Sequence, residues 1–342
     1  MSSVTPKRIL FIRPSALGDI CRSVPVVARL KKKWPDASID WLVRSEFVEA
    51  VNAHPAVDQV IPFQRQALKR WYFPKGFVKM ISFLRSLKSN KYDLVIDGQG
   101  LGRSGLFAWA TGSPIRIGLA SAREFGWLGY TEKVQTTSEH TVDQMLSLCN
   151  YIGASDGIEM ELYCNANDSH WWGEYREANA IEEYAVIAPT SRWKSKQWPI
   201  ERFASVAQHL QDLGVHVVVV GAPTESSQVS TLLELDGITN LLPSMTVGRM
   251  MAVIAPAKIV IANDSAALHM AVGFNRTLIG LFGPTEPRKV GPYNKLDSVI
   301  AANVDYNAVH YRDRALGTQA IEQIETSEVL AKVDQLLKVM VT

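Results

Sequence analysis

Short apolar stretches, rich in β-branched residues and bounded by turn-forming residues, recur along this chain. They predict strands at residues 8–13, 39–43, 57–61, 92–97, 116–118, 184–189, 215–221, 258–263 and 277–283. The segments between them carry apolar residues at helical spacing, as in Val24-Val27-Leu30. Strands that alternate with helices in this way form βαβ units. The pattern therefore predicts an α/β protein with parallel sheets.

The alternation lapses between about residues 151 and 183, where the sequence is polar, acidic and rich in turn formers. A chain of 342 residues exceeds the size at which a single core usually stops growing. We therefore expect two Rossmann-like, doubly wound domains that face each other across a cleft. Their predicted boundaries are 1–165 for the first domain, 166–183 for a linker, 184–318 for the second domain and 319–342 for a terminal segment containing an amphipathic helix.

The composition narrows the classes of function. Net charge is only +2, which argues against a general nucleic-acid binder. The cysteines, Cys21, Cys149 and Cys164, are spaced for neither a zinc site nor a disulfide framework and suit a reducing cytosol. The sequence shows no stretch resembling a signal peptide or a membrane span. We expect a cytoplasmic globular protein.

Polar residues gather where the predicted strands of the second half end. Thr190, Ser191 and Lys196 follow one strand, and Asp264, Ser265 and His269 follow another, where Asp264 or Ser265 can cap the next helix. Gly283 to Thr285 and Glu225 follow two more strands, and Glu225 could bind ribose hydroxyls. Each loop alone is compatible with an ordinary capped helix or a solvated basic loop. Together they predict a pocket for a nucleoside diphosphate.

Two motifs of nucleotide-binding proteins are missing from the sequence. It does not contain G-x-x-x-x-G-K-[ST], which weakens the case for a P-loop NTPase. It also lacks a D-x-D pair, so we expect no metal at the diphosphate and no cofactor. Cationic side chains and helix N-termini would then stabilise the phosphate charge.

Residues 64–91 form a second candidate surface. They include eight Lys or Arg residues and no acidic residue, interleaved with aromatic side chains. Such a stretch can bind anionic lipid headgroups or an anionic acceptor. It is also compatible with an amphipathic helix whose basic face is merely solvated, and less so with an RNA-binding patch.

Asp19 raises a separate question, because it follows the first strand and either caps a helix or does chemistry. Its segment, SALGDICRSVPVVARL, and the segments YDLVIDGQGL, TSRWKSKQWP, GAPTE, LLPSMT, NDSAALH and LFGPTEP resemble the ADP-heptose:lipopolysaccharide heptosyltransferases, glycosyltransferase family 9. The resemblance spans about residues 8 to 290 and is strongest to the type I enzymes, which add the first heptose to the inner core.

The resemblance implies a GT-B fold, with acceptor bound by the first domain, nucleotide sugar by the second, and a final helix that packs back on the first. It also implies inverting, metal-independent transfer of heptose from ADP-heptose to a Kdo-lipid A type acceptor, at the cytoplasmic face of the inner membrane. The implied catalytic residues are Asp19, as base, and Lys196. The donor-binding set is Thr190, Ser191, Lys196, Glu225, Met245, Asp264, Ser265, Ala266 and His269, and the predicted acceptor-binding set is Arg22, Arg65, Lys69, Arg70, Gln99 and Arg123.

Three positions depart from the family pattern. Arg22 stands where a histidine is common, Ala16 where a serine or threonine often sits, and Ala266 where glycine is usual. An alanine would be strained at position 266 if the backbone there had a positive φ. Two alternatives stay open: a related GT-B enzyme with another donor or acceptor, such as a type II heptosyltransferase, and a non-catalytic nucleotide-binding module at a membrane surface.

Overall fold

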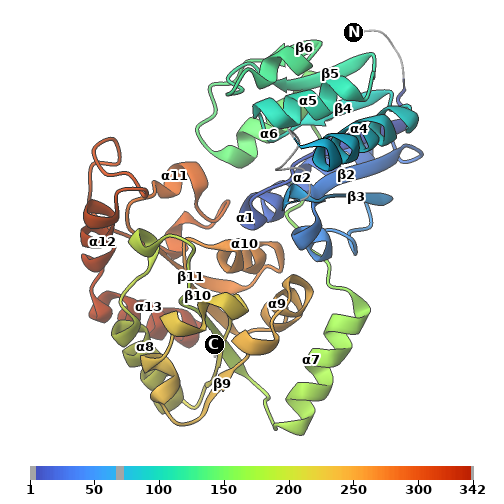
Figure 1. The fold of residues 1–342 in the computed structure, drawn as a ribbon. Coiled ribbons are helices and arrows are strands. Elements are labelled where there is room, and N and C mark those ends of the chain that lie inside the picture. The colour runs from blue at the N-terminus through green and yellow to red at the C-terminus, as the bar shows by residue number, and fades with distance from the viewer. Residues whose placement is uncertain (1–4, 67–72, 340–342) are drawn as a thin grey trace. The chain divides into compact units, whose positions relative to one another are not determined.

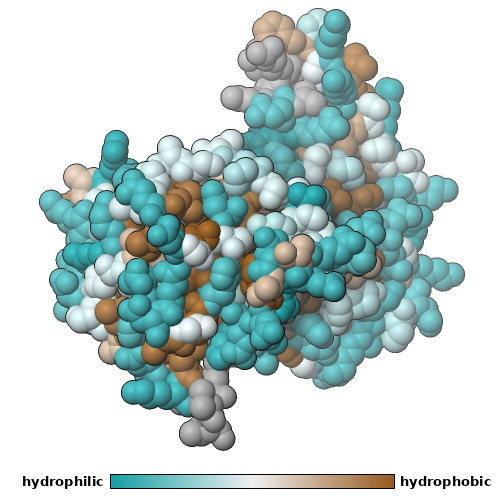
Figure 2. Space-filling model, turned by 90° about the horizontal axis from the view of Figure 1, so that it is seen from below, coloured by the Kyte–Doolittle hydropathy of each residue, from teal (hydrophilic) through white to brown (hydrophobic). Residues whose placement is uncertain are grey.

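The computed structural model describes residues 5–66 and 73–339, and its contacts divide the chain into two compact units, Met1–Tyr163 and Cys164–Thr342 (Figure 1). Each unit contains one six-stranded parallel sheet covered by helices. The division falls close to the predicted boundary at residue 165. On the face seen in Figure 2, hydrophilic side chains cover most of the surface, and hydrophobic ones show in smaller areas between them.

The first unit has the strand order β3-β2-β1-β4-β5-β6. Its core includes β1 residues that alternate in direction and are buried on both faces, as expected for a central parallel strand. Its elements are β1 (Arg8–Ile12), α1 (Leu17–Cys21), α2 (Val24–Lys33), β2 (Ser38–Arg44), η1 (Ser45–Ala50), β3 (Gln59–Phe63), α4 (Pro74–Ser89), β4 (Leu94–Asp97), α5 (Gly102–Ala110), β5 (Ile115–Leu119), η2 (Gly126–Gly129), β6 (Glu132–Val134) and α6 (Thr141–Tyr151), where η denotes a 3-10 helix.

The second unit repeats this winding, with the order β12-β11-β10-β7-β8-β9. Its elements are α7 (Ala166–Ala178), β7 (Tyr184–Ala188), η3 (Lys194–Lys196), α8 (Ile200–Asp212), β8 (His216–Val219), η4 (Pro223–Gln228), η5 (Thr231–Glu234), β9 (Ile238–Asn240), η6 (Leu242–Ser244), α9 (Val247–Ile254), β10 (Ile259–Asn263), α10 (Ala266–Gly273), β11 (Thr277–Phe282), α11 (Pro287–Val290), η7 (Leu296–Ser298), β12 (Val299–Ala301), α12 (Arg314–Glu322) and α13 (Thr326–Val339).

The segment predicted as a linker is largely helical. Residues 166–178 form α7, which packs against α9 of the second unit. Trp172 is buried there and donates a hydrogen bond from Nε1 to the Tyr184 hydroxyl at 2.7 Å. The polar composition that suggested a loop is the solvent-facing side of this helix, because only one of its side chains is fully buried.

The terminal helix α13 packs within the second unit, beside α8 and β11 (Figure 1). Its apolar stripe of Val329, Val333 and Leu337 is buried in the same core as Phe203 and Leu210 of α8. The prediction that the final helix packs back on the first domain stays a prediction, because these contacts lie within the second unit alone. The hydrophobic face needed a partner, and α8 supplies one in its own unit.

Glycine allows an unusually close contact between α5 and η2. A Cβ atom built on Gly105 would lie 2.1 Å from the carbonyl oxygen of Gly126, and one on Gly129 would lie 2.0 Å from the carbonyl oxygen of Gly105. The two backbones therefore pack directly on each other, without intervening side chains.

We expect Gly105→Ala to lower the free energy of unfolding by at least about 2 kcal/mol, because the added methyl group has no room. The matched control is Gly173→Ala in α7, where nothing lies within 4 Å of a built Cβ. Alanine should stabilise that helix slightly. Urea unfolding of both variants checks this. Equal changes in the free energy of unfolding would show that the α5 and η2 backbones move apart to make room for the methyl group.

Candidate functional sites

The strand order places a crevice at the same point of each sheet. Chain connections leave β1 and β4 in opposite directions in the first unit, and β7 and β10 do the same in the second. Ligands of doubly wound proteins bind beyond the carboxyl ends of such strands. Asp19 follows β1 and Gln99 follows β4, whereas Lys196 follows β7 and Asp264 follows β10. The topology thus brings predicted residues to both crevices.

Asp19 lies in α1 and is held between two arginines. Its Oδ1 is 2.5 Å from Nη2 of Arg22 and 3.3 Å from Nη2 of Arg13, at the end of β1. Its Oδ2 accepts a hydrogen bond from the backbone N–H of Ala16 at 3.0 Å. The side chain keeps 27% of its surface exposed. Asp19 therefore satisfies the helix start and also presents a carboxylate to solvent.

The loop after β4 completes the surroundings of Asp19. The backbone N–H of Ser15 donates to Oε1 of Gln99 at 3.2 Å, and the Arg13 guanidinium donates to the carbonyl oxygen of Gly98. Buried Asp97 shapes this loop by accepting from the Gln99 N–H at 2.8 Å and from the Tyr130 hydroxyl at 2.6 Å. Burial raises the pKa of Asp97 despite these donors. Asp97 and Arg13 were missed because neither motif nor spacing marks a supporting residue.

The predicted acceptor residues divide into four groups. Arg22 and Gln99 contact the Asp19 group, and Arg22 also donates to the Thr141 hydroxyl at 2.8 Å. Arg123 is exposed, and its backbone N–H donates to the carbonyl oxygen of Gly100, next to Gln99, at 2.9 Å. Arg65 is exposed. Lys69 and Arg70 lie outside the described residues.

The second crevice is organised around Lys196 and Asp264. Nζ of Lys196 lies 2.6 Å from Oδ2 of Asp264, which also accepts from the Thr285 hydroxyl at 2.8 Å. Burial opposes the charge on Asp264, but Lys196, His269 and Thr285 outweigh it, so the pKa of Asp264 is lowered. Loops after the adjacent strands β7, β10 and β11 thus converge on one carboxylate.

Asn263 holds two of these loops together. It is fully buried at the end of β10, accepts from the backbone N–H of Trp198 at 3.1 Å and donates to the carbonyl oxygen of Pro189 at 2.6 Å. The adjoining Thr190 and Ser191 are also buried. An asparagine between two apolar runs signals a turn, so its clamping role could not be predicted from the sequence.

Glu225 and Met245 lie on neighbouring turns beside this group. Oε2 of half-buried Glu225 accepts from the backbone N–H of Ala222 at 3.0 Å, which closes the turn after β8. Met245 is buried at the end of η6, and η6 packs against η4, which contains Glu225. Nε2 of Gln197 donates to the carbonyl oxygen of Ser191 and to Oε1 of Gln228, both at 2.7 Å. The η4 turn is therefore tied to the Lys196 loop.

Helix α10 begins at this crevice with Ser265, Ala266 and His269. The predicted side-chain cap is not formed: Asp264 bonds Lys196 instead, and the buried Ser265 hydroxyl has no hydrogen-bond partner among the described residues. Ala266 is the first helical residue and is not among the residues with positive φ, so the expected strain does not arise. His269 is buried one turn into the helix.

Tyr311 adds an aromatic ring to the group and was also missed. Nζ of Lys196 lies 4.9 Å from the centroid of this ring, and the Trp193 ring packs edge-on against it at 5.2 Å. The Ser195 hydroxyl donates to the Tyr311 carbonyl oxygen at 2.5 Å. The segment around Tyr311 is distant in sequence and carried no pattern of its own, so only the folded structure reveals the contact.

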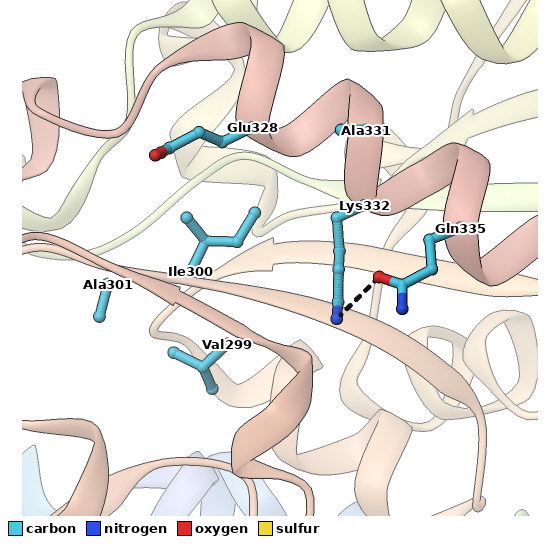
Figure 3. A pocket seen from close by; sticks show the side chains of 7 residues that line it. All are labelled: Val299, Ile300, Ala301, Glu328, Ala331, Lys332 and Gln335. Carbon is cyan, nitrogen blue, oxygen red and sulfur yellow. Dashed lines mark hydrogen bonds between the residues drawn. The ribbon is translucent and has the colours of Figure 1, made fainter.

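A separate hollow of about 420 Å³ lies between β12 and α13 (Figure 3). In Figure 3 Lys332 extends from α13 and donates to Oε1 of Gln335 at 3.3 Å. This hollow shares no residue with the Lys196 group.

Within residues 5–66 and 73–339, no cluster of three His, Cys, Asp or Glu side chains is placed to hold a metal ion. None of the helices in these ranges is long and apolar enough to cross a membrane.

Known proteins match this chain over most of its length. The model of glycosyltransferase family 9 (heptosyltransferase) matches residues 80–317. Lipopolysaccharide heptosyltransferase 1 of Escherichia coli K12 is 28% identical over 302 residues, which cover 86% of this chain and 93% of that protein.

Two solved structures share the fold. E. coli ADP-heptose lps heptosyltransferase II superposes with a TM-score of 0.80 at 22% identity, covering 98% of this chain and all of that one. E. coli heptosyltransferase WaaC with ADP gives a TM-score of 0.78 at 24% identity, covering 96% and 99%. The predicted GT-B fold is confirmed. The family model covers well over half of the sequence, and the chain therefore belongs to glycosyltransferase family 9, the heptosyltransferases.

Proposed function

We propose that this protein transfers heptose from ADP-heptose to a Kdo-lipid A type glycolipid in the assembly of the lipopolysaccharide inner core. The observation that carries the proposal is the convergence of Lys196, Asp264 and Thr285 from three adjacent strand ends of the second unit. A lysine beside buried hydroxyls and a helix N-terminus suits a nucleoside diphosphate. A structural neighbour that was solved with ADP supports this choice of donor.

In the proposed donor site, Lys196 exchanges Asp264 for the diphosphate. Thr190, Ser191 and Ser265 would donate hydrogen bonds to phosphate oxygens, and the buried Ser265 hydroxyl lacks a hydrogen-bond partner among the described residues. Asp264, Ala266 and His269 would border the sugar at the start of α10. Glu225 would accept hydrogen bonds from the ribose hydroxyls, and Met245 would pack against adenine.

In the proposed reaction Asp19 removes the proton of the acceptor hydroxyl. The hydroxyl oxygen then attacks the anomeric carbon while the bond from that carbon to ADP breaks, so the configuration inverts. Lys196 and the hydroxyl donors stabilise the negative charge that develops on the departing ADP. The proposed scheme uses fixed cations for this task and requires no metal or cofactor.

In the proposed acceptor site, Arg22, Gln99 and Arg123 bind acidic sugars of the glycolipid. Arg22 and Arg13 now neutralise Asp19. Sugar carboxylates would compete for these guanidinium groups, which would free Asp19 to accept a proton. Arg65, Lys69 and Arg70 belong to the basic stretch 64–91, which would attract anionic headgroups at the cytoplasmic face of the inner membrane.

The direct test is to incubate the protein with ADP-heptose and Kdo-lipid A and to measure product mass and anomeric configuration. We expect one added heptose, release of ADP and an inverted anomeric centre. A type II heptosyltransferase would instead require an acceptor that already carries one heptose. Turnover only with a UDP- or GDP-sugar would contradict the proposed donor, and no turnover with any donor would favour a non-catalytic binding module.

Tyr311 is a positioning residue in this proposal. We expect Tyr311→Leu to raise KM for ADP-heptose about 3- to 10-fold with a smaller change in kcat, because a cation–π contact with Lys196 is lost. Tyr311→Phe keeps the ring and should restore the parental KM. Steady-state kinetics of both variants checks this. The same rise in KM in both variants would mean that the hydroxyl matters and the ring does not, and a parental KM in both would exclude a role for Tyr311.

A further inference from the structure

Exposed apolar side chains concentrate on neighbouring elements of the first unit. Among the large hydrophobic residues that the structure shows exposed, Leu106 and Trp109 of α5 are 40% and 60% exposed, and Phe125 and Leu128 at η2 are 73% and 63% exposed. We call these four residues the α5–η2 patch. Single exposed apolar residues are normal, but a group on elements in contact indicates an interaction surface.

The glycine contact explains why these side chains point outward. Gly102, Gly105 and Trp109 follow one another along a single face of α5, and the glycines of that face meet the backbone of the 124–129 segment. Because the interface between α5 and η2 is filled by backbone, it has no space for the large side chains of either element. The side chains of the patch therefore extend outward from a tightly packed contact between two backbones.

The backbone conformation at Phe125 also supports an interaction surface. Glu124 and Phe125 both have positive φ, at 55° and 60°, a left-handed conformation that is unfavourable for a bulky side chain. This conformation turns the chain into η2, whose first residue is the glycine packed against Leu101. A phenylalanine that is both strained and largely exposed contributes little to folding, which favours a role in binding.

The charges around the patch favour an anionic partner. Arg103 on α5 is exposed, as are Arg123 and Lys133 on either side of η2, and Glu124 is the exposed acidic residue among them. Helix α4, which packs against α5, adds Lys75, Lys79, Arg85 and Lys88 and contains no acidic residue. Two copies of such a basic surface would repel each other, whereas anionic lipid headgroups would attract it.

The patch also adjoins the candidate acceptor site within the same unit. The Arg123 backbone N–H donates to the carbonyl oxygen of Gly100. Gln99 directly precedes Gly100, and its Oε1 accepts from the backbone N–H of Ser15 near Asp19. Only Glu124 separates Arg123 from Phe125. A glycolipid whose sugar reached Asp19 could thus have its acyl chains in a bilayer beside the patch.

We infer that the α5–η2 patch inserts into the surface of an anionic bilayer and so places the first unit where a membrane-bound acceptor can reach Asp19. The inference rests on the proposed glycolipid acceptor, but insertion itself can be measured without any substrate. Aromatic and leucine side chains flanked by basic residues are typical of interfacial anchors.

The test compares flotation with vesicles of phosphatidylcholine alone and of phosphatidylcholine with phosphatidylglycerol. We expect the parent to bind the anionic vesicles, and the triple variant Trp109→Ser, Phe125→Ser, Leu128→Ser to bind them at least about 10-fold more weakly. The matched control, Leu213→Ser, Leu296→Ser, Leu316→Ser, removes exposed leucines of the second unit, which are 43–49% exposed, and should bind like the parent.

Brominated lipid reports insertion directly, because it quenches tryptophan emission within the bilayer. We expect quenching in the parent and a clear loss of it in Trp109→Phe, which keeps an apolar ring at the same place. No vesicle binding by the parent, or equal binding by the patch and control variants, would overturn the inference. A patch variant that changed only the oligomeric state in sedimentation would assign the surface to self-association instead.

Activity measurements separate this inference from the proposed function. With a water-soluble, deacylated acceptor sugar, the patch variant should turn over like the parent, whereas with acceptor embedded in vesicles it should be slower. Failure of the parent with both acceptors would contradict the proposed function and leave vesicle binding as the test of the patch. Equal loss with both acceptors would show that the patch variant is misfolded or that the patch belongs to the catalytic site, which overturns the inference.

Discussion

Replacement of Asp19 by asparagine is expected to lower kcat about 100-fold or more while leaving the affinity for ADP unchanged. An amide cannot take the proton of the acceptor hydroxyl, so the reaction would lose its base. The proposed donor-binding residues all belong to the second unit, whereas Asp19 lies in the first. Turnover with saturating substrates and calorimetric titration with ADP measure the two quantities separately.

Asparagine keeps most hydrogen bonds around position 19 but removes the negative charge that neutralises Arg13 and Arg22, so the fold has to be checked. Its amide oxygen can still accept from the Ala16 N–H, and the two arginines keep other acceptors, Gly98 for Arg13 and Thr141 for Arg22. Unchanged ADP binding and an unchanged circular dichroism spectrum would show that the fold persists.

The matched control is Asp36→Asn, an exposed carboxylate of the same unit. It should behave like the parent, because a solvated surface carboxylate has no part in the proposed chemistry. Near-parental turnover in Asp19→Asn would reject Asp19 as the base. Equal losses in both variants would point to a general effect of net charge.

The central strands could be predicted from sequence because burial on both faces makes them continuous apolar runs. β1, β7, β8 and β10 each fall inside a predicted stretch. The strands that were missed, β6, β9 and β12, have three residues each and lie at sheet edges. An edge strand of three residues is too short for a periodic signal and is defined mainly by its hydrogen bonds to a neighbour.

The structure brings predicted site residues together where chemistry and topology coincide. Lys196 and Asp264 follow separate strands, and their meeting depends on β7 and β10 being neighbours, which the βαβ winding rule makes natural. Asn263, Asp97 and Tyr311 could not be predicted in the same way. Each acts through a contact with a distant segment, and its residue type is common in turns and cores.

Lys196→Ala is expected to weaken ADP binding about 10- to 100-fold and to lower turnover as well, because one charged hydrogen bond to the diphosphate is lost in both states. The matched control is Lys194→Ala, an exposed lysine in the same 3-10 helix, which should bind ADP like the parent. Parental ADP affinity in Lys196→Ala would show that the phosphate site is misplaced.

Lys196→Ala should also destabilise the fold by about 3 kcal/mol, because Asp264 then remains buried without its cation. The pKa of Asp264 is lowered in the parent, so the ion pair stabilises the fold above the ordinary pKa of aspartate and is lost as pH falls. Without Lys196, we expect the pKa of Asp264 to rise relative to the parent, because the lysine no longer opposes the effect of burial. The gap in unfolding free energy between parent and variant should therefore be widest near neutral pH and narrow on acidification.

The double variant Lys196→Ala, Asp264→Asn separates the stability effect from the binding effect. The amide carries no charge and can still accept from Thr285, so urea unfolding should return most of the lost stability at neutral pH. ADP affinity should stay low, because the cation that would meet the diphosphate is still missing. Recovery of both properties together would mean that Lys196 serves only to neutralise Asp264, and the diphosphate would then have to be held by the hydroxyls and the start of α10 alone.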